Sequence, residues 1–589
     1  MRFWRGQTRE VERRRAAGLP AVDEMQRFRL LVCCLFCSIC TSLVYAFDLF
    51  TTQFVERFHL SVGDQSTIST VGLAFCYFTL PYGFLFDYAG PFPLILICLV
   101  TGGLGALLLG LTFDGFIPGS VTNISVFYAM MNTCAGLLDV AYVVTLAEAF
   151  PRNLGPVLAL AKVLAGLGSS VLASVSVNLF GDNISGFIYA IMAYSVVVCG
   201  VAAFVVVLPP YFVNGWRRRG KSVEQLAAMR ALEPAYRRKF VPVRRLGVGY
   251  AVVALLLVFF TVQAPVVSYT KVSRGASVAL GVVTIALVLC FFLMLLPVRW
   301  LGGMDSDAEE EPVRLDSAEE GALAGRGNKA SPDPADTPDG AASVSDVDSG
   351  IPQDPRYGGS VWDNLKRADI WLIFIAFICH SAMGVIVVYN ASTISVALTG
   401  HKRSQQTSAL YTAFLGVSSS VGRMAMGMFE AFVQHQPPDN RRFLVTLALP
   451  LAPLLAAVAG LLFLTIPGEA ILLPYIIVYF QQGLFTAVAA VIFPSLFASD
   501  HGVYYNVGFL TSVLSVIGFN RFLFGYVVDA KHASLGFGPE EECTVAECVR
   551  LPLIVATCVA AVGAAFAFLV HIRYSRFVRE VRREAEEMD

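Results

Sequence analysis

The chain has 589 residues, of which 56% are hydrophobic, 12% are aromatic and 15% are charged, and its mean hydropathy is +0.65. Soluble domains carry about 25% charged residues, so this composition excludes a soluble protein and predicts one that crosses a membrane many times. The formal net charge is −1. Because basic and acidic residues occupy separate segments, this net value favours no class of partner.

About 14 apolar stretches are long enough to cross a bilayer core of about 30 Å, which requires about 20 helical residues. We predict spans near residues 30–52, 66–87, 92–113, 125–148, 156–180, 186–210, 247–269, 277–297, 369–396, 406–430, 443–466, 469–496, 504–529 and 550–572. The expected fold is therefore an all-α polytopic membrane protein. It has two six-helix halves and two extra central helices.

The segments between these spans differ in composition, and they divide the chain into seven parts. We expect a basic N-terminus (1–28), the first half (29–210), a basic linker (211–246), the two extra helices (247–297), an acidic loop (298–368), the second half (369–572) and a tail (573–589). The acidic loop alternates carboxylates with Ser, Gly, Pro and Ala and buries too little apolar surface to fold. We predict a disordered tether there, or a phosphorylated switch at sites such as Ser306 and Ser317.

Arginine and lysine gather on one side of the predicted membrane topology. The N-terminal arginines, the linker and the tail all fall on the same side, which the positive-inside rule identifies as cytoplasmic. Both termini are then cytoplasmic, and the sequons at Asn123 and Asn183 lie outside, where glycosylation is expected. Cys543 and Cys548 lie in a polar loop and could form a disulfide. These features favour the plasma membrane, with a vacuolar or endolysosomal membrane as the alternative.

The two halves share a sequence pattern. The run from Gly136 to Phe150 matches the run from Gly483 to Phe497 at Gly, Leu and Phe positions, and Cys37 near the start of the first half corresponds to Cys379. Two similar helical halves that face each other across a bilayer can enclose a cavity and rock open to either side. This repeat predicts a secondary transporter.

The stretch Gly83-Phe-Leu-Phe-Asp87-Tyr-Ala-Gly90-Pro91 resembles the Gly-x-Leu-x-Asp-x-x-Gly signature of the major facilitator superfamily. Pro91-Phe-Pro replaces the basic residues that usually follow, and this departure resembles the nodulin-like branch. Phe150-Pro-Arg-Asn-Leu-Gly155 and Tyr505-Asn-Val-Gly508 look like that branch's patterns in the fifth helix and the C-terminal half. The resemblance covers both halves but neither the N-terminus nor the acidic loop.

The resemblance implies a gating role for this motif. Asp87 would cap a neighbouring helix end and hold the outward-open state, with Arg423 as a candidate partner from the second half. Gly83 and Gly90 would allow close helix approach and a tight turn. The alternative for Arg423 is an interfacial arginine whose side chain snorkels toward the headgroups.

Ionisable side chains inside the bilayer are costly and point to function. Asp139, near the middle of the fourth span, is a candidate cation or proton site, and an ion pair with Lys162 is the alternative. Asp48 and Asn390 occupy matching places in the first helix of each half, so they are expected to face one another across the cavity or else to cap helix ends.

Three further features point to metals or anions. His380 lies near a membrane midplane and is a candidate proton-coupling group or metal ligand, or a packing residue. Cys37 shares one helical stripe with Cys33 and Cys40, and thiolates favour soft or borderline metals, but cysteine is also an ordinary small apolar residue. A metal site would combine Asp139, His380 and Cys37. Lys162 and Arg521 could instead bind an organic carboxylate, unless Arg521 pairs with Asp529.

Several classes of protein lack support in the sequence. It contains no Gly-x-x-x-x-Gly-Lys-[Ser/Thr] phosphate loop for ATP, no identifiable nucleophile–base arrangement and no nucleic-acid patch. We therefore expect no enzyme and no cofactor, and we expect a monomer in the lipid bilayer that is driven by a proton or solute gradient. Its partner is a small molecule or an ion.

The sequence favours one substrate over two alternatives. Some nodulin-like relatives are associated with iron efflux, and the acidic, His and Cys inventory favours export of a transition-metal cation, iron, from the cytosol. The first alternative is a proton-coupled organic anion carrier. The second is a transporter-like nutrient sensor that signals through its acidic loop.

Overall fold

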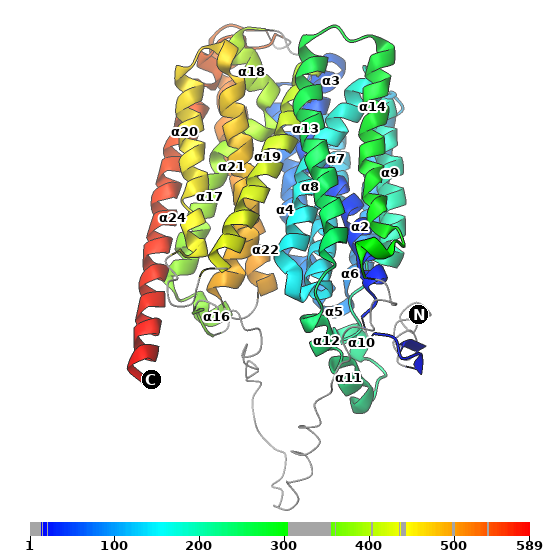
Figure 1. Cartoon of the computed structure of the whole chain (residues 1–589). Helices are drawn as coiled ribbons and strands as arrows, with labels where there is room; N and C mark the ends of the chain where they lie inside the picture. The colour runs from blue at the N-terminus through cyan, green and yellow to red at the C-terminus, as the bar shows by residue number, and fades with distance from the viewer. Residues whose placement is uncertain are drawn as a thin grey trace, which may run out of the picture.

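The computed structural model describes most of the chain between residue 13 and residue 588 (Figure 1). The described residues are 13–14, 16–20, 22–303, 355–359, 361–401, 404–434, 436, 443–497, 501–538 and 541–588. The acidic stretch from 304 to 354, for which we predict disorder, lies outside them. The helices stand side by side in one bundle, and the described chain begins and ends at the same end of it, here called the terminal end (Figure 1).

The first half contains six membrane-crossing segments, several of which are built from two consecutive helices. Its elements are α2 (Glu24–Thr41), η1 (Ser42–Ala46), α3 (Asp48–Phe58), α4 (Val62–Tyr77), α5 (Leu80–Ala89), α6 (Pro91–Phe113), α7 (Val121–Ala149), η2 (Pro151–Asn153), α8 (Leu154–Val175), η3 (Ser176–Phe180) and α9 (Ile184–Val205). Gly90 ends α5 with φ of 83°, a conformation that suits glycine, and Pro91 begins α6.

The linker between the halves is folded rather than extended. Its elements are α10 (Gly215–Arg218), α11 (Val223–Arg230), α12 (Glu233–Arg238), α13 (Val243–Tyr269), α14 (Arg274–Leu289), η4 (Cys290–Leu295) and η5 (Arg299–Leu301). The three short helices α10–α12 lie at the terminal end (Figure 1). Arg217 is buried there and donates to the carbonyls of Leu208 (2.7 Å) and Phe212 (3.0 Å), and burial lowers its pKa to about 10.

The second half repeats the six-span arrangement. Its elements are α16 (Val361–Asn364), α17 (Ala368–Tyr389), α18 (Ala391–Thr399), α19 (Gln405–Gln434), η8 (Val445–Ala448), α20 (Leu451–Thr465), η9 (Gly468–Ala470), α21 (Leu472–Leu496), α22 (His501–Ser515), η10 (Val516–Tyr526), α23 (Val527–Ser534) and α24 (Glu547–Met588). Apart from an isolated bridge between Tyr357 and Phe497, the described residues contain no β-structure.

The predicted all-helical membrane fold is confirmed. By length and hydropathy, 13 helical segments of the described chain can cross a membrane, and each coincides with a predicted span. The remaining predicted span, 406–430, corresponds to α19, which has 30 residues. This helix is more polar because it carries Ser418, Ser419, Ser420 and Arg423. It packs in the interior, against α8 and α21, so it needs less apolar surface than a helix that faces lipid.

The repeated glycines hold equivalent positions in the two halves. A Cβ atom on Gly136 of α7 would lie 1.9 Å from the carbonyl oxygen of Cys76 on α4, and one on Gly483 of α21 would lie 1.8 Å from the carbonyl oxygen of Ser419 on α19. Each glycine therefore lets its helix approach a neighbour to backbone contact. The sequence repeat is thus a repeat of helix packing.

The two halves meet mainly along two helix pairs, α8 with α19 and α4 with η10. Buried polar side chains join the extra helices α13 and α14 to α8: Ser174 lies 2.7 Å from the Thr284 hydroxyl and accepts from Gln263 Nε2 at 2.9 Å. The polar contacts therefore join the extra helices to the first half, while α13 also packs on α19 of the second half.

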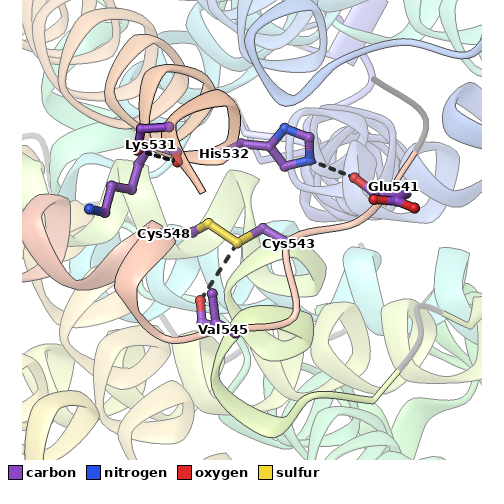
Figure 2. The surroundings of a disulfide bond; sticks show 7 residues. Lys531, His532, Glu541, Cys543, Val545 and Cys548 are labelled. Atoms are coloured by element: carbon purple, nitrogen blue, oxygen red, sulfur yellow. Dashed lines mark hydrogen bonds between the residues drawn. A yellow bond between two sulfur atoms is a disulfide. The ribbon is translucent and has the colours of Figure 1, made fainter. Parts of the chain in front are cut away.

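A disulfide lies in a loop at the end of the bundle opposite the termini. Figure 2 shows the disulfide between Cys543 and Cys548 in the loop before α24. The same loop is held to the end of α23, because His532 Nε2 lies 2.6 Å from the Glu541 carbonyl oxygen. This cross-link and hydrogen bond fix the connection between the last two spans.

Candidate functional site: a cavity between the two halves

A cavity of about 130 Å³ lies between the halves. Its walls come from α2, η1, α4, α7 and α8 of the first half and from α17, α19, α21 and α22 of the second. Its volume is well below the roughly 300–1,000 Å³ of pockets that hold drug-sized ligands. The cavity is therefore suited to a small solute that contacts both halves at once.

Asp139 and Lys162 form an ion pair in the cavity wall. Lys162 Nζ donates to both carboxylate oxygens of Asp139, at 2.8 Å and 2.7 Å, and the Tyr142 hydroxyl donates to Asp139 Oδ1 at 2.7 Å. Both charged side chains are largely buried. Of the two sequence-based alternatives for Asp139, the structure therefore contains the ion pair, in which each charge offsets the other.

Arg423 of α19 is the second basic side chain of the cavity, and it is only 4% exposed. Its guanidinium donates to Thr486 Oγ1 (3.0 Å), to the Lys162 carbonyl oxygen (2.9 Å) and to the Tyr45 hydroxyl (3.4 Å). No carboxylate of the described residues forms an ion pair with it. All of these partners are neutral, so the positive charge of Arg423 is not compensated within the described chain.

The charges of the cavity thus do not cancel. The described lining contains one carboxylate, Asp139, and two basic side chains, Lys162 and Arg423. In a medium of low dielectric constant, an uncompensated cation strongly favours a bound anion. The cavity is therefore suited to an anionic solute.

Comparison with known proteins assigns the architecture. Residues 31–305 match the family model of the Major Facilitator Superfamily. The chain is also similar to the structure of a bacterial homologue of the human drug peptide transporters PepT1 and PepT2, with a TM-score of 0.50, 9% sequence identity, and coverage of 95% of this chain and 100% of that one. The molecule has the major facilitator fold.

Two other transporter structures are similar to this chain. They are the xylose transporter XylE from E. coli (TM-score 0.48, 12% identity, 92% of this chain and 96% of that one) and an auto-inhibited POT family peptide transporter (TM-score 0.45, 12% identity, 93% and 96%). No curated protein matches the sequence. The family match and the fold indicate a transporter rather than an enzyme. The residues that line the cavity indicate which kind of solute it suits.

The stretch from Gly83 to Gly90, which resembles the major facilitator signature, comprises the end of α5 and its C-cap and lies at the terminal end of the bundle. None of its residues lines the cavity. Gly83 allows close contact with α22, because its Cβ would lie 3.0 Å from Asn506 Nδ2. Asp87 is exposed, and it has no hydrogen-bond or ion-pair partner in the described part of the chain. The expected pairing of Asp87 with Arg423 is therefore absent from this structure, because the Arg423 guanidinium is bound inside the cavity. The snorkelling alternative is also wrong, since Arg423 is buried.

Asp48 bonds directly to the other half and Asn390 does so only through Asn520, and neither lines the cavity. Asp48 accepts from the Ser392 hydroxyl (2.6 Å) and backbone N–H (3.3 Å) at the start of α18. Asn390 donates to Asn520 Oδ1 (2.8 Å), and Asn520 in turn donates to Ser69 Oγ (2.8 Å) on α4. They do not face each other across the cavity, because neither side chain lies in its described lining.

The proposed metal ligands do not converge. Cys37 is buried inside the first half, His380 packs against Phe485, and Asp139 is bonded to Lys162. No group of three or more His, Cys, Asp or Glu side chains in the described residues has the arrangement of a metal site. Cys379, the repeat partner of Cys37, lies instead beside Gly563 of α24. The geometry therefore does not assemble the metal site that the sequence suggests.

Arg521 lies outside the cavity, so it does not complement Lys162 as expected. Its guanidinium and the Asp529 carboxylate both lie next to Gly63 of α4, but no ion pair within 4.0 Å joins them. The arginine that sequence reasoning missed as a solute ligand is Arg423. One sequence signal could have found it. Thr486 is the repeat partner of Asp139, and the two residues accept hydrogen bonds from Arg423 and Lys162, respectively.

Proposed function

We propose that this protein is a secondary active transporter that moves a small organic anion, a carboxylate, by alternating access. The observation that carries the proposal is Arg423, a buried cation without a carboxylate partner in the described chain, in a cavity between two similar halves. A carboxylate accepts two parallel hydrogen bonds from a guanidinium. Binding of the carboxylate would therefore supply the missing counter-charge.

The position of Arg423 relates solute binding to the rocking of the two halves. It belongs to α19 of the second half, and it donates to the carbonyl oxygen of Lys162 on α8 of the first half. A solute held by Arg423 therefore contacts both sides of the interface that has to move. Binding energy that differs between the two orientations would shift their populations.

The ion pair between Asp139 and Lys162 suggests how protons would couple to transport. When Asp139 takes up a proton, Lys162 loses its counter-charge and becomes available to the anion. One proton and one monovalent anion would then cross together without net charge. We propose Asp139 as the proton site and Lys162 as an additional anion ligand. Each chain holds a complete cavity, so we propose that it works as a monomer.

Export of a transition-metal cation such as iron, which the sequence inventory favours, receives less support. Asp139, His380 and Cys37 lie apart, and the excess positive charge of the described cavity lining repels a bare cation. A sensor without transport is also less favoured, because the described cavity is shared by both halves, as a carrier requires. We propose the plasma membrane as the site of action and cytoplasmic termini, from the basic residues at the terminal end.

The test is uptake into liposomes that contain the purified full-length protein. The radiolabelled probes are the monovalent anions lactate, pyruvate and propionate, each with and without an inward-directed proton gradient. We expect Arg423→Gln to lower carboxylate uptake at least about tenfold, which corresponds to about 1.4 kcal/mol. Arg521→Gln, which removes a membrane arginine outside the cavity, is the matched control and is expected to retain uptake.

Equal loss in the Arg521 and Arg423 variants, or no uptake of any probe, would contradict the anion proposal. Iron efflux from cells that express the protein is the measurement to make in that event. Efflux that requires Asp139 and His380 would restore the metal hypothesis.

A separate variant tests proton coupling. Asp139→Asn keeps the size of the side chain but cannot exchange a proton near neutral pH. We expect its residual carboxylate uptake to be insensitive to the proton gradient, whereas uptake by the unmodified protein rises with the gradient. The chain with Asp139→Asn and Lys162→Met serves as the control for an unpaired lysine, because removing one partner of a buried pair costs about 3–5 kcal/mol of stability. Retained gradient dependence in Asp139→Asn would rule out this proton site.

A further inference from the structure

Three polar side chains beside the cavity have buried atoms without a hydrogen-bond partner. His380 of α17 is 1% exposed and both of its ring nitrogens are unpartnered, and Gln481 of α21 is 0% exposed with both amide atoms unpartnered. The Oε1 atom of Gln482 is also buried and unpartnered. Most buried polar atoms in proteins have partners, so three such groups in one region call for an explanation.

These three side chains lie at one contact between α17 and α21. A Cβ atom on Gly384, one turn after His380, would lie 2.3 Å from Gln482 Oε1 and 3.6 Å from Gln481 Nε2. The His380 ring stacks on Phe485, with 3.8 Å between ring centroids, and Phe485 lies one turn after Gln481. Glycine at position 384 leaves room for the two amides. The group is therefore a single polar patch rather than three unrelated side chains.

The patch is continuous with the wall of the cavity. Gln482 and Phe485 line the cavity, as does Ser381, which follows His380 in the chain. His380 and Gln481 are not in the lining: they lie behind it, and the Phe485 ring is stacked on the His380 ring. A rotation of the Phe485 side chain would expose the imidazole to a solute. Arg423 and Thr486 lie in the same lining, and Thr486 comes from the same helix as Gln482.

We propose that His380, Gln481 and Gln482 form a second subsite, which binds the hydroxyl group of the carboxylate held by Arg423. This inference rests on the proposed function and narrows it to small hydroxycarboxylates. The unpartnered atoms include acceptors, the two Oε1 atoms, and donors, Gln481 Nε2 and one nitrogen of a neutral imidazole. A hydroxyl group is both a donor and an acceptor and can meet both needs, whereas a keto group is only an acceptor.

The experiment compares probes that differ in one functional group. Lactate carries a hydroxyl group beside the carboxylate, which is both a donor and an acceptor, pyruvate carries only an acceptor there, and propionate carries neither. In the liposome assay we expect the unmodified protein to prefer lactate over both propionate and pyruvate by at least about tenfold, because a site with unmet hydrogen bonds rejects an analogue that cannot make them. The Gln481→Leu, Gln482→Leu double variant is expected to reduce this ratio at least fivefold.

Two further variants complete the test. His380→Phe is expected to lower the ratio in the same direction, and Gln263→Leu, which alters a buried glutamine of α13 outside the cavity, is expected to leave it unchanged. Folding is checked by thermal denaturation, in which the lactate-induced rise in Tm should become smaller in the double variant, because Arg423 still holds the carboxylate. Replacing unpartnered buried amides by leucine should not lower the Tm of the free protein.

The outcomes separate the two proposals. If Arg423→Gln abolishes uptake but the double variant keeps its preference for lactate, the carboxylate proposal stands and the second subsite is wrong. Equal uptake of lactate, pyruvate and propionate by the unmodified protein would also overturn the subsite. Absence of uptake for every probe would overturn both proposals.

Discussion

At the scale of single residues, the position of the buried guanidinium depends on a glycine. Gly166 of α8 faces Arg423, and a Cβ atom there would lie within 2.3 Å of Arg423 Nη1 and 2.5 Å of Ser420 Oγ. Glycine at this position therefore makes the space that Arg423 occupies. Its role is to allow close approach of two helices from different halves, not an unusual backbone conformation.

This contact leads to a prediction for Gly166→Ala. The added methyl group should displace the guanidinium from Thr486 and the Lys162 carbonyl oxygen, and carboxylate uptake should fall about tenfold, or about 1.4 kcal/mol in apparent affinity. Gly155→Ala is the matched control, because Gly155 is on the same helix and has no atom within 4 Å of its ideal Cβ position. Concentration-dependent uptake in liposomes measures the effect. Equal behaviour of the two variants would show that Arg423 does not need its observed position.

At the scale of elements, the two extra helices are attached to the first half by a polar network inside the membrane. Ser174 of α8 bonds with Thr284 of α14 and with Gln263 of α13, and Asn178 accepts from Ser277 of α14 at 3.0 Å. Polar contacts of this kind are worth roughly 0.6–2 kcal/mol each in membranes. The extra pair is therefore expected to move with the first half, while its contact with α19 changes as the halves rock.

Element boundaries followed the sequence where a local signal marks them. Gly90-Pro91 separates α5 from α6, and Ser61 and Asp64 form a capping box at the start of α4. The linker after residue 211 was predicted only as basic. Its three short helices depend on contacts that composition does not reveal, such as Arg217 bonding to the preceding carbonyls.

At the scale of the whole molecule, the disulfide between Cys543 and Cys548 gives a test of orientation. The loop that carries it lies at the end opposite the termini (Figure 1). If the termini are cytoplasmic, this loop is outside the cell, where disulfides persist. In the described residues the other cysteines are free, and most of them are buried.

We therefore expect a membrane-impermeant maleimide to label the protein in intact cells only after treatment with an impermeant reductant. The Cys543→Ser, Cys548→Ser variant is expected to remain unlabelled under both conditions, which controls for the other cysteines. Labelling that requires permeabilised cells would place the loop inside and reverse the proposed orientation. Because the cysteines are only 5 residues apart, their reduction should cost less stability than the roughly 3 kcal/mol of a 15-residue loop.

The sequence by itself determined the class of molecule, the positions of the membrane helices and their division into similar halves. These properties follow from local runs of apolar residues, because each span must bury its backbone in lipid by itself. The sequence match of Gly136 with Gly483 corresponds to equivalent packing positions in the structure, because close helix approach requires glycine in both halves.

Only the tertiary structure decided which polar side chains meet. Arg423, Lys162 and Asp139 come from three different helices, and no periodicity along one helix fixes the distance between atoms on another. For the same reason, the expected meeting of Cys37, His380 and Asp139 failed: each lies in a membrane helix, but the helices turn them toward different neighbours. The sequence thus predicted a carrier, and the packing of its helices produced a cavity with an unpaired cation.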